Sequence, residues 1–246
     1  SDGVFAGYDY DTAGLSLGID KALANNMLLG FSGSMTGTDV EYDNNGAKHE
    51  IEATIFNLYG SYLMDNIHID SILSYADNSY DSVRSVPAVG WLTSEHDGTD
   101  MSLSINAGYL MELDALNVIP SAGVEYALHD EDKYTEYDST GAAFMQLDDF
   151  DTDSLKTRLG VRANRVFALS DTMDLMGQAR LQWAHEFADT EREVTARFTG
   201  ASSSFRVQGL EPERDSVGCG LDMILSLRKT LQVNLSYDAE WRDGFE

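Results

Sequence analysis

Apolar and polar residues alternate along most of this chain. The alternation is most regular from Leu231 to Arg242, where Leu, Val, Ala and aromatic residues fill every second position and polar or charged residues fill the others. Because successive side chains of a strand point to opposite faces, this period of two predicts a strand with one apolar and one polar face. The pattern recurs and predicts ten antiparallel strands in all. They cover residues 12–20, 27–36, 56–62, 67–75, 101–109, 118–126, 155–163, 175–186, 216–225 and 231–242.

The length of these strands and the rhythm of their connections indicate an outer-membrane barrel. The strands run to roughly 9–13 residues, whereas strands of soluble sheets have about 5–6 and a tilted strand needs about 9–11 to cross a bilayer. Short links alternate with long polar ones, as periplasmic turns and extracellular loops do in such barrels. We therefore predict an all-β fold, an antiparallel up-and-down transmembrane β-barrel in the bacterial outer membrane with its long loops extracellular. The long links are residues 39–50, 78–99, 129–153 and 189–215.

The polar face of each strand would line the interior of the barrel, because the apolar face meets lipid. Two hypotheses describe the charges on this wall. In one, bases on the strands at 155–163 and 175–186 face acids on the last two strands, and the resulting transverse field orients a threaded segment. In the other, neighbouring opposite charges pair and only neutralise one another. The residues expected to line the lumen are Lys156, Arg158, Arg162, Arg180, Asp222, Asp238, Glu240 and Arg242.

Aromatic residues gather near the ends of the predicted strands. Membrane barrels carry one aromatic belt at each lipid–water interface. Because some of these residues adjoin long links and others adjoin short turns, the pattern predicts two belts; the alternative is that strands are simply rich in aromatic residues. The residues assigned to the aromatic girdle are Tyr62, Tyr75, Tyr109, Tyr126, Trp183, Phe187, Tyr237 and Trp241.

The charge of the chain excludes one class of partner. Sixteen Lys and Arg against 42 Asp and Glu give a formal net charge of −26. So acidic a chain is repelled by phosphate backbones, and we expect no nucleic-acid partner. The single cysteine, Cys219, excludes an internal disulfide framework and a cysteine-rich zinc site. No run of apolar residues is long enough to predict a transmembrane helix.

The long link 129–153 holds the candidates for chemistry. His129 and Asp130, with Asp148 and Asp149, are the residue types of a barrel-rim protease, in which a general base must lie within hydrogen-bond reach of a water or nucleophile. The simpler alternative is a solvated acidic loop, and we expect no enzyme activity. The acids do not follow the spacing of a calcium-binding loop, so no metal site and no cofactor are expected.

Small, aromatic and charged residues recur in a specific order along the chain. The C-terminal third contains Phe205, Gly209, Arg214, Asp215, Gly218, Gly220, Leu221, Leu235, Tyr237 and Asp238. Earlier members are Ala13, Gly14, Leu15, Leu17, Gly18, Asp20, Pro120, Gly123, Tyr126, Leu159, Gly160, Val161, Arg162, Trp183, His185 and Phe187. In order and spacing these residues resemble the autotransporter β-domain, the translocator barrel of bacterial self-secreting outer-membrane proteins. The similarity extends from about Tyr10 to Arg242.

The resemblance implies transport rather than catalysis. It implies that the barrel supports the export and surface anchoring of an N-terminal passenger. Its expected partners are outer-membrane lipid, the protein's own passenger and linker helix, and the barrel-assembly machinery. Family barrels have twelve strands, so residues 1–246 are expected to form one translocator domain that lacks the first and last strands. A ten-stranded barrel protease and a porin-like channel are the alternatives.

Overall fold

The structure is a computed structural model of the chain, and it describes residues 7–43, 46–114, 116–191, 193–209, 211–228 and 231–242. Every helix or strand assigned within these ranges is a β-strand, and no helix there is long and apolar enough to cross a membrane. The fifteen strands of the described residues are β1 (Tyr8–Ala24), β2 (Met27–Tyr42), β3 (Lys48–Met64), β4 (Ile67–Val86), β5 (Gly90–Tyr109), β6 (Met111–Leu113), β7 (Leu116–Glu131), β8 (Tyr134–Asp138), β9 (Ala143–Leu147), β10 (Phe150–Ser170), β11 (Met173–Glu186), β12 (Glu193–Phe198), β13 (Phe205–Gln208), β14 (Asp215–Leu227) and β15 (Leu231–Arg242).

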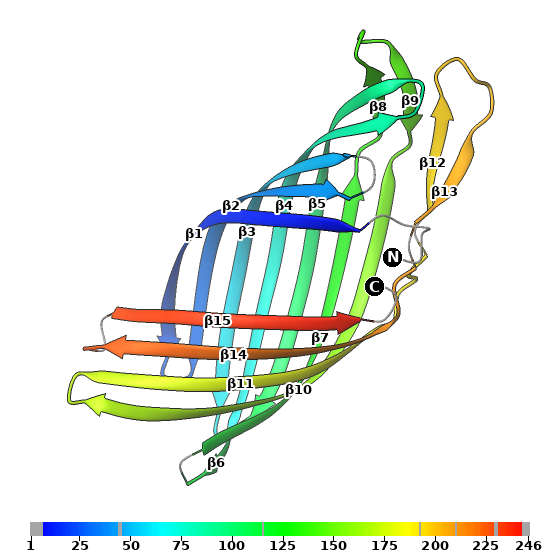
Figure 1. Cartoon of the computed structure of the whole chain (residues 1–246). Helices are drawn as coiled ribbons and strands as arrows, with labels where there is room; N and C mark the ends of the chain where they lie inside the picture. The colour runs from blue at the N-terminus through cyan, green and yellow to red at the C-terminus, as the bar shows by residue number, and fades with distance from the viewer. Residues whose placement is uncertain are drawn as a thin grey trace.

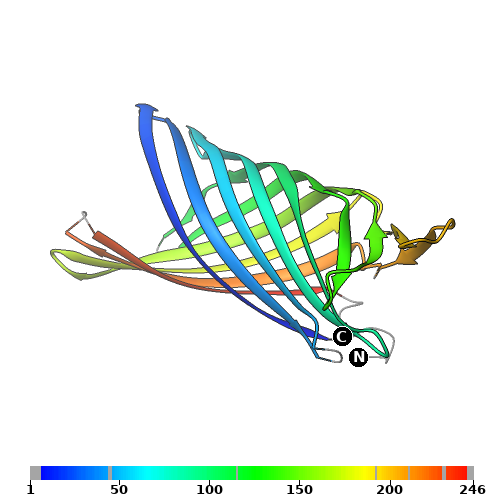
Figure 2. The same ribbon diagram turned by 90° about the horizontal axis from the view of Figure 1, so that it is seen from above.

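Ten of the strands form one long antiparallel path in the order β1-β2-β3-β4-β5-β7-β10-β11-β14-β15. Each pairs with the next long strand along the chain, which is the predicted up-and-down arrangement. The sheet curls into an open barrel, with β1 and β15 on either side of the opening (Figures 1 and 2). Within the described residues β1 pairs only with β2 and β15 only with β14, and almost all residues of both strands are exposed.

Contacts between distant strands identify the concave face of this sheet. Arg162 Nη2 on β10 lies 3.5 Å from His68 Nε2 on β4, although β5 and β7 separate the two strands in the sheet. Side chains that far apart in a curved sheet meet only on its concave side. Because Arg162 belongs to the polar set of its strand, the concave face carries the polar residues and the convex face carries the apolar ones.

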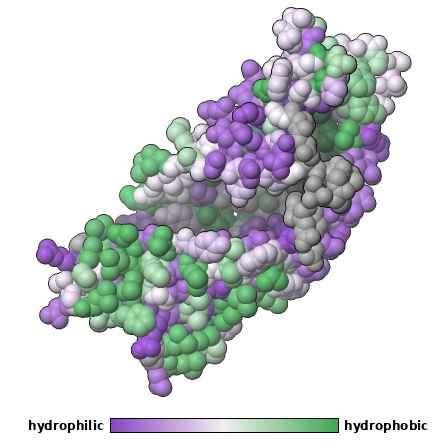
Figure 3. All heavy atoms as spheres, in the orientation of Figure 1, coloured by the Kyte–Doolittle hydropathy of each residue, from purple (hydrophilic) through white to green (hydrophobic). Residues whose placement is uncertain are grey.

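Large apolar side chains cover the convex face. Leu17, Leu221 and Leu235 are 71%, 60% and 70% exposed, and apolar side chains gather over β14 and β15 in Figure 3. Soluble monomers rarely expose so continuous an apolar surface. On β5 this surface extends from Met101 to Tyr109, within the about 9–11 residues that a tilted strand needs to cross a bilayer. We call the outward apolar residues of the ten long strands the lipid-facing band.

The strands continue past the predicted boundaries at the end of the barrel that carries the long links. β4 and β5 have 20 residues each and β10 has 21, so most of the predicted link 78–99 is strand. The prediction was wrong because the outward residues there become acidic, as at Asp77 and Asp97. The apolar–polar alternation therefore ends at the edge of the lipid-facing band, although the hydrogen-bonded pairing of the strands does not.

Four short strands occupy the predicted long links 129–153 and 189–215, which were expected to be loops. β8 pairs with β5 and β9, β9 also pairs with β12, and β12 pairs with β13. We call β8, β9, β12 and β13 the collar, because they extend the barrel wall past the lipid-facing band (Figure 1). Each has only four to six residues, too few for the sequence pattern to separate them from a loop.

At the opposite end of the barrel tight turns connect neighbouring strands, as the short links predict. Between β3 and β4 the turn consists of Asp65 and Asn66, and Asp65 has a φ of 51°. Two-residue hairpin turns need positive φ values, which Asp and Asn adopt at little steric cost. This explains how Asp65 and Asn66 connect the two strands without a longer loop.

Replacement of Ile105 by arginine tests the assignment of the two faces. Ile105 is an exposed residue of the lipid-facing band, and arginine near the bilayer midplane costs about 2–4 kcal/mol. We expect a large loss of the folded, heat-modifiable band on a gel. Ser104→Arg is the matched control, because Ser104 lies on the concave face opposite Glu125, and we expect it to fold normally. An equal loss in both variants would contradict the assignment.

Candidate functional site

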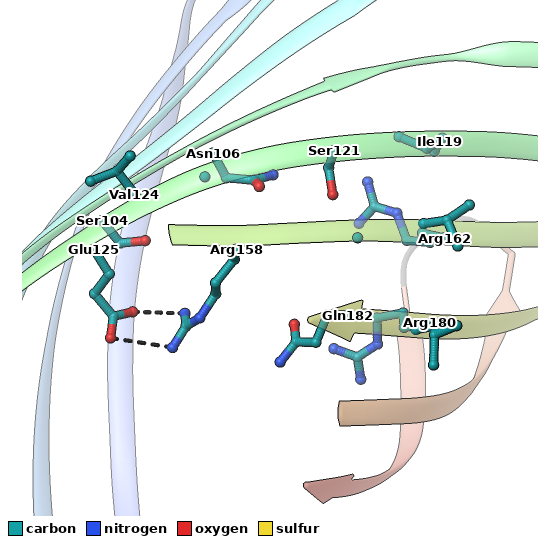
Figure 4. A pocket seen from close by; sticks show the side chains of 14 residues that line it. Ser104, Asn106, Ile119, Ser121, Val124, Glu125, Arg158, Arg162, Arg180 and Gln182 are labelled. Atoms are coloured by element: carbon teal, nitrogen blue, oxygen red, sulfur yellow. Dashed lines mark hydrogen bonds and ion pairs between the residues drawn. The ribbon is translucent and has the colours of Figure 1, made fainter. Parts of the chain in front are cut away.

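The candidate functional site is the concave wall of the barrel. The strand register places all eight predicted lumen residues on this face of β10, β11, β14 and β15. Arg158, Arg162 and Arg180 project into a cavity of 220 Å³, which Ser104 and Asn106 on β5 also line (Figure 4). The wall is therefore polar and hollow at the depth of the lipid-facing band.

Most charges on this wall pair with a near neighbour. Arg158 Nη1 lies 2.7 Å from Glu125 Oε2. Arg180 bridges Asp222 at 3.1 Å and Asp238 at 2.9 Å. Lys156 Nζ lies 4.0 Å from a Glu186 carboxylate oxygen, and Arg242 Nη2 lies 3.8 Å from Glu240 Oε1. These contacts join residues on the same strand, on adjacent strands or, for Arg180 and Asp238, on strands separated only by β14. They therefore favour local neutralisation over a transverse field across the lumen.

Gly220 makes room for the Arg180 bridge. A Cβ atom at this position would lie 2.5 Å from Asp238 Oδ1 and 2.8 Å from Arg180 Nη2. Both distances are too short for carbon beside polar heavy atoms. The glycine therefore lets the two charged side chains meet over the backbone of β14, which explains its place on the polar face of that strand.

Arg162 is the exception on the wall. Within the described residues it has no carboxylate within ion-pair distance, and its recorded polar neighbour is His68 at 3.5 Å. Its Nε atom is buried and makes no hydrogen bond there. Arg162 therefore presents an uncompensated guanidinium to the cavity, where Figure 4 shows it beside Ser121 and Ile119.

A second polar cluster, which we call the rim network, lies on the concave face just beyond the lipid-facing band. It consists of His96 and Asp100 on β5 and His129 and Glu131 on β7. His129 Nδ1 lies 2.7 Å from Asp100 Oδ1, and His129 Nε2 lies 3.4 Å from Glu131 Oε2. His96 Nε2 lies 2.6 Å from Glu131 Oε1. The network ties β5 to β7 where the strands leave the lipid.

The rim network also fixes the collar to the barrel. The ring of His96 is stacked between Tyr80 at 4.9 Å and Tyr134, the first residue of β8, at 4.0 Å. The His96 side chain is only 4% exposed. A second attachment is the bidentate pair of Arg84 with Glu136 on β8, at 2.5 and 2.6 Å. Such charge-assisted fork contacts are strong and geometrically specific.

The charges of the rim network shift one another's pKa values. Hydrogen bonds with Asp100 and Glu131 raise the pKa of His129 to about 9. Hydrogen bonds with His129 and His96 lower the pKa of Glu131 to about 2. The hydrogen bond with His129 also lowers the pKa of Asp100. At neutral pH, His129 is therefore protonated between two ionised carboxylates.

The structure does not bring together the four residues of the alternative interpretation, a rim protease. His129 faces the concave side and bonds to Asp100 and Glu131, whereas its neighbour Asp130 points to the convex side and is exposed. Asp148 and Asp149 lie between β9 and β10, and no hydrogen bond or ion pair among the described residues joins them to His129. A protonated His129 also lacks the free nitrogen lone pair of a general base. No group of three or more His, Cys, Asp or Glu side chains in the described residues is arranged to hold a metal ion.

Seven of the eight predicted aromatic residues lie on the convex face of their strands, Phe187 follows the end of β11, and all eight are exposed. Tyr62 and Tyr109 lie near the short-turn ends of β3 and β5. Trp183 Nε1 donates a hydrogen bond to Asp215 Oδ1 at 2.9 Å, so its polar edge points away from the apolar surface. Tyr237 lies in the middle of β15 rather than near an end. The depth of these residues in a membrane stays a prediction.

The sequence analysis missed the rim network except for His129. His96 and Glu131 are 35 residues apart and Asp100 and His129 are 29 apart, so no local motif joins them. The strand register is the feature of the sequence that could have predicted these contacts. Extending the antiparallel pairing of residues 101–109 with 118–126 places Asp100 directly opposite His129.

Comparison with protein families finds one match over nearly the whole chain. The model described as "Autotransporter beta-domain" matches residues 1–238. Outer membrane protein A of Rickettsia conorii is 24% identical over 254 residues, which cover 95% of this chain. The same alignment covers only 12% of that relative, so the chain spans a small part of its length.

Two solved structures share the fold. The β domain of the Bordetella autotransporter BrkA superposes with a TM-score of 0.69 at 20% identity and covers 96% of this chain and 86% of that one. The translocator domain of the autotransporter NalP from Neisseria meningitidis gives a TM-score of 0.63 at 14% identity, with 95% and 79% covered. At these identities the likeness shows a common fold.

The rim network predicts a pH-dependent attachment of the collar. Because the pKa of His129 is raised, its contribution to stability is present below its ordinary value of 6.5 and is lost as the pH rises through about 9. The lowered pKa of Glu131 gives a contribution that is present above 4.5 and is lost as the pH falls towards 2. We therefore expect a protease added at pH 6.5 to cut the collar of His129→Gln faster than that of the wild type. The difference should disappear above the pKa of His129; a constant ratio of the two rates would refute this.

An exchange of charges tests local pairing on the wall. Arg158→Glu would set two carboxylates against each other and should destabilise the barrel by about 1 kcal/mol, because the pair is partly solvated. Adding Glu125→Arg restores the pair with its members exchanged, and we expect the stability to recover. The measurement is the temperature at which the heat-modifiable band is lost. If the double variant remains as unstable as the single one, the charges do not act as a local pair.

Proposed function

The chain belongs to the autotransporter β-domain family, and on this premise we propose that it carries an N-terminal passenger of a longer protein to the cell surface and anchors it there. Its fold is that of an outer-membrane translocator barrel, and its place is the bacterial outer membrane. This fold is not that of an enzyme. The identity and activity of the passenger belong to a part of the protein outside this chain.

One observation supports this function above the others: the convex face of the sheet suits lipid, whereas the concave face suits water. The convex face carries exposed leucines such as Leu17 and Leu235, which suit lipid. The concave face carries paired charges and a polar cavity. An extended or helical segment can pass along such a wall without leaving backbone groups unpaired in lipid.

Arg162 gives the threaded segment a point of attachment in this proposal. It faces the cavity without a carboxylate partner among the described residues, whereas each of the other seven predicted lumen residues has an oppositely charged partner. A linker segment from the same protein that carries an Asp or Glu side chain would complete an ion pair there. Charge-assisted contacts of this kind are the stronger class of hydrogen bond.

The remaining partners and the orientation follow from the surfaces. Outer-membrane lipid would cover the lipid-facing band, and the barrel-assembly machinery would insert the strands. We place the collar and the long-link end outside the cell, because outer-membrane barrels put tight turns in the periplasm and longer connections outside. The exposed edges of β1 and β15 would pair with further strands of the same protein.

Obstruction of the lumen tests the proposal. Ser121 lies on the concave face beside the cavity, so Ser121→Trp should obstruct the passage and reduce display of the passenger on intact cells about tenfold. Ala122→Trp is the matched control, because Ala122 points to lipid. Both variants should give equal amounts of folded barrel on a gel. Undiminished display by a folded Ser121→Trp variant would argue against export through this lumen and would favour a porin-like role.

A further inference from the structure

One arginine interrupts the lipid-facing band near the short-turn end of the barrel. Arg165 belongs to the outward set of β10, and its side chain is exposed. It lies five residues before Ser170, where β10 ends. An arginine on the lipid face is costly at the middle of a bilayer, but the cost falls steeply near an interface, where a long side chain can reach the lipid head groups. The position of Arg165 therefore predicts a contact with head groups at this end of the barrel.

The side chain of Arg165 leans towards the short turns. Its Cζ atom lies over the ring of Phe167, 5.0 Å from the ring centroid. Phe167 is the next outward residue of β10 in the direction of the turn that joins β10 to β11. The negative face of an aromatic ring attracts a cation and holds it in this position. The guanidinium therefore points out of the hydrocarbon, towards the interface at the short turns.

Among the described residues no carboxylate neutralises Arg165. The nearest acids in sequence are Asp171, in the turn after β10, and Asp174, which belongs to the concave set of β11. No ion pair among the described residues joins either acid to Arg165. The outward acids of the described long strands lie only towards the long-link end, as Asp77 and Asp153 do. The convex face at the short-turn end therefore favours an anion.

The neighbouring bases strengthen this preference. Lys48, an outward base at the long-link end of β3, already pairs with Glu41. Lys21, an outward base near the short-turn end of β1, has no ion pair within the described part of the chain. Arg228, in the turn after β14, donates its backbone N–H to Thr172 O at 2.8 Å, so it lies beside the turn that follows β10. Unpaired positive charge thus gathers at the short-turn end.

Open space beside Arg165 can admit part of a lipid. Gly177 on β11 is directly opposite Arg165 and places no side chain next to it. A Cβ atom at Gly177 would meet only the ring of Phe167, at the ordinary contact distance of 3.9 Å. The packing of the neighbouring residues therefore does not require a glycine there. We call this open space the Gly177 gap; it leaves room for the glycerol backbone of a lipid whose phosphate lies at the guanidinium.

We propose that Arg165 and the Gly177 gap bind an anionic glycerophospholipid of the periplasmic leaflet through its phosphate. A guanidinium donates to two phosphate oxygens at once, which gives a charge-assisted contact of defined geometry. A head group with a net negative charge, such as phosphatidylglycerol, is favoured over a zwitterionic one, because an ammonium group finds no outward acid at this end. This inference rests on the orientation given in the proposed function, and it adds the head-group class of the lipid partner.

Titration of the full-length protein with lipids tests the site. The protein is extracted from outer membranes in a mild detergent, and native mass spectrometry counts the bound lipids as phosphatidylglycerol or phosphatidylethanolamine is added. One arginine near anionic lipid contributes about fivefold in affinity. The wild type should therefore prefer phosphatidylglycerol about fivefold, and Arg165→Gln should lose this preference. Lys48→Gln is the matched control and should keep it, because Lys48 is an outward base with an acidic partner. An unchanged preference in Arg165→Gln, or an equal loss in Lys48→Gln, overturns the proposal.

A second variant separates the charge from the space beside it. Gly177→Leu keeps Arg165 and fills the Gly177 gap, so it should also remove the preference for phosphatidylglycerol. A folded Gly177→Leu variant that retains the preference overturns the proposal, and this variant decides if Arg165→Gln fails to fold.

Competition with lipid A identifies the leaflet. Lipid A carries the phosphates of the outer leaflet, and we expect it not to displace phosphatidylglycerol from the wild type. Displacement that depends on Arg165 would place the site in the outer leaflet and overturn the proposal. Passenger display does not enter any of these measurements, so export through the lumen is judged separately by the Ser121→Trp variant.

Discussion

The need to pair every backbone amide and carbonyl group in a solvent without water governs this structure. Hydrocarbon supplies no hydrogen bonds, so a strand that crosses it must be paired along its whole length with its neighbours. The register of β3 with β4 is accordingly unbroken from Lys48 to Met64. An up-and-down order with tight turns meets this need with the least connecting chain. The edges of β1 and β15 are the places where the need is not met within the described residues, which supports the proposal that further strands of the same protein pair with them.

The same alternation of side chains has three different outcomes because the surrounding solvent changes along the barrel. In the lipid-facing band the apolar set points outward and the charged set points into the lumen. Beyond the band, both faces of β4 and β5 become polar, with Asp77 and Asp97 outside and the rim network inside. On the collar strands β9, β12 and β13 the apolar set turns to the concave side. The position of the lipid boundary can therefore be inferred from residue polarity alone, without reference to the loops.

The alternation of apolar and polar residues along the sequence was sufficient to predict the strands and the two faces of the sheet. The ten long strands, their order, the two faces and the concave position of Arg158 and Arg180 all follow from alternation over seven or more residues. The family resemblance is confirmed. The strand ends were not predictable, because acids on the outward face remove the pattern while pairing persists. The collar was missed because its strands are too short, and the rim network because its partners are 29 and 35 residues apart.

Local neutralisation of the wall has a consequence for transport. A lumen with a strong net field would bind any oppositely charged segment tightly along its length and slow its release, because charges in a partly dehydrated space interact strongly. Pairing Arg158 with Glu125, and Arg180 with two aspartates, removes most of that field within the wall itself. Arg162 is then a single point of attraction rather than one member of a continuous charged surface. A wall of this kind can hold one defined linker in place and still let a segment of varied sequence move past it.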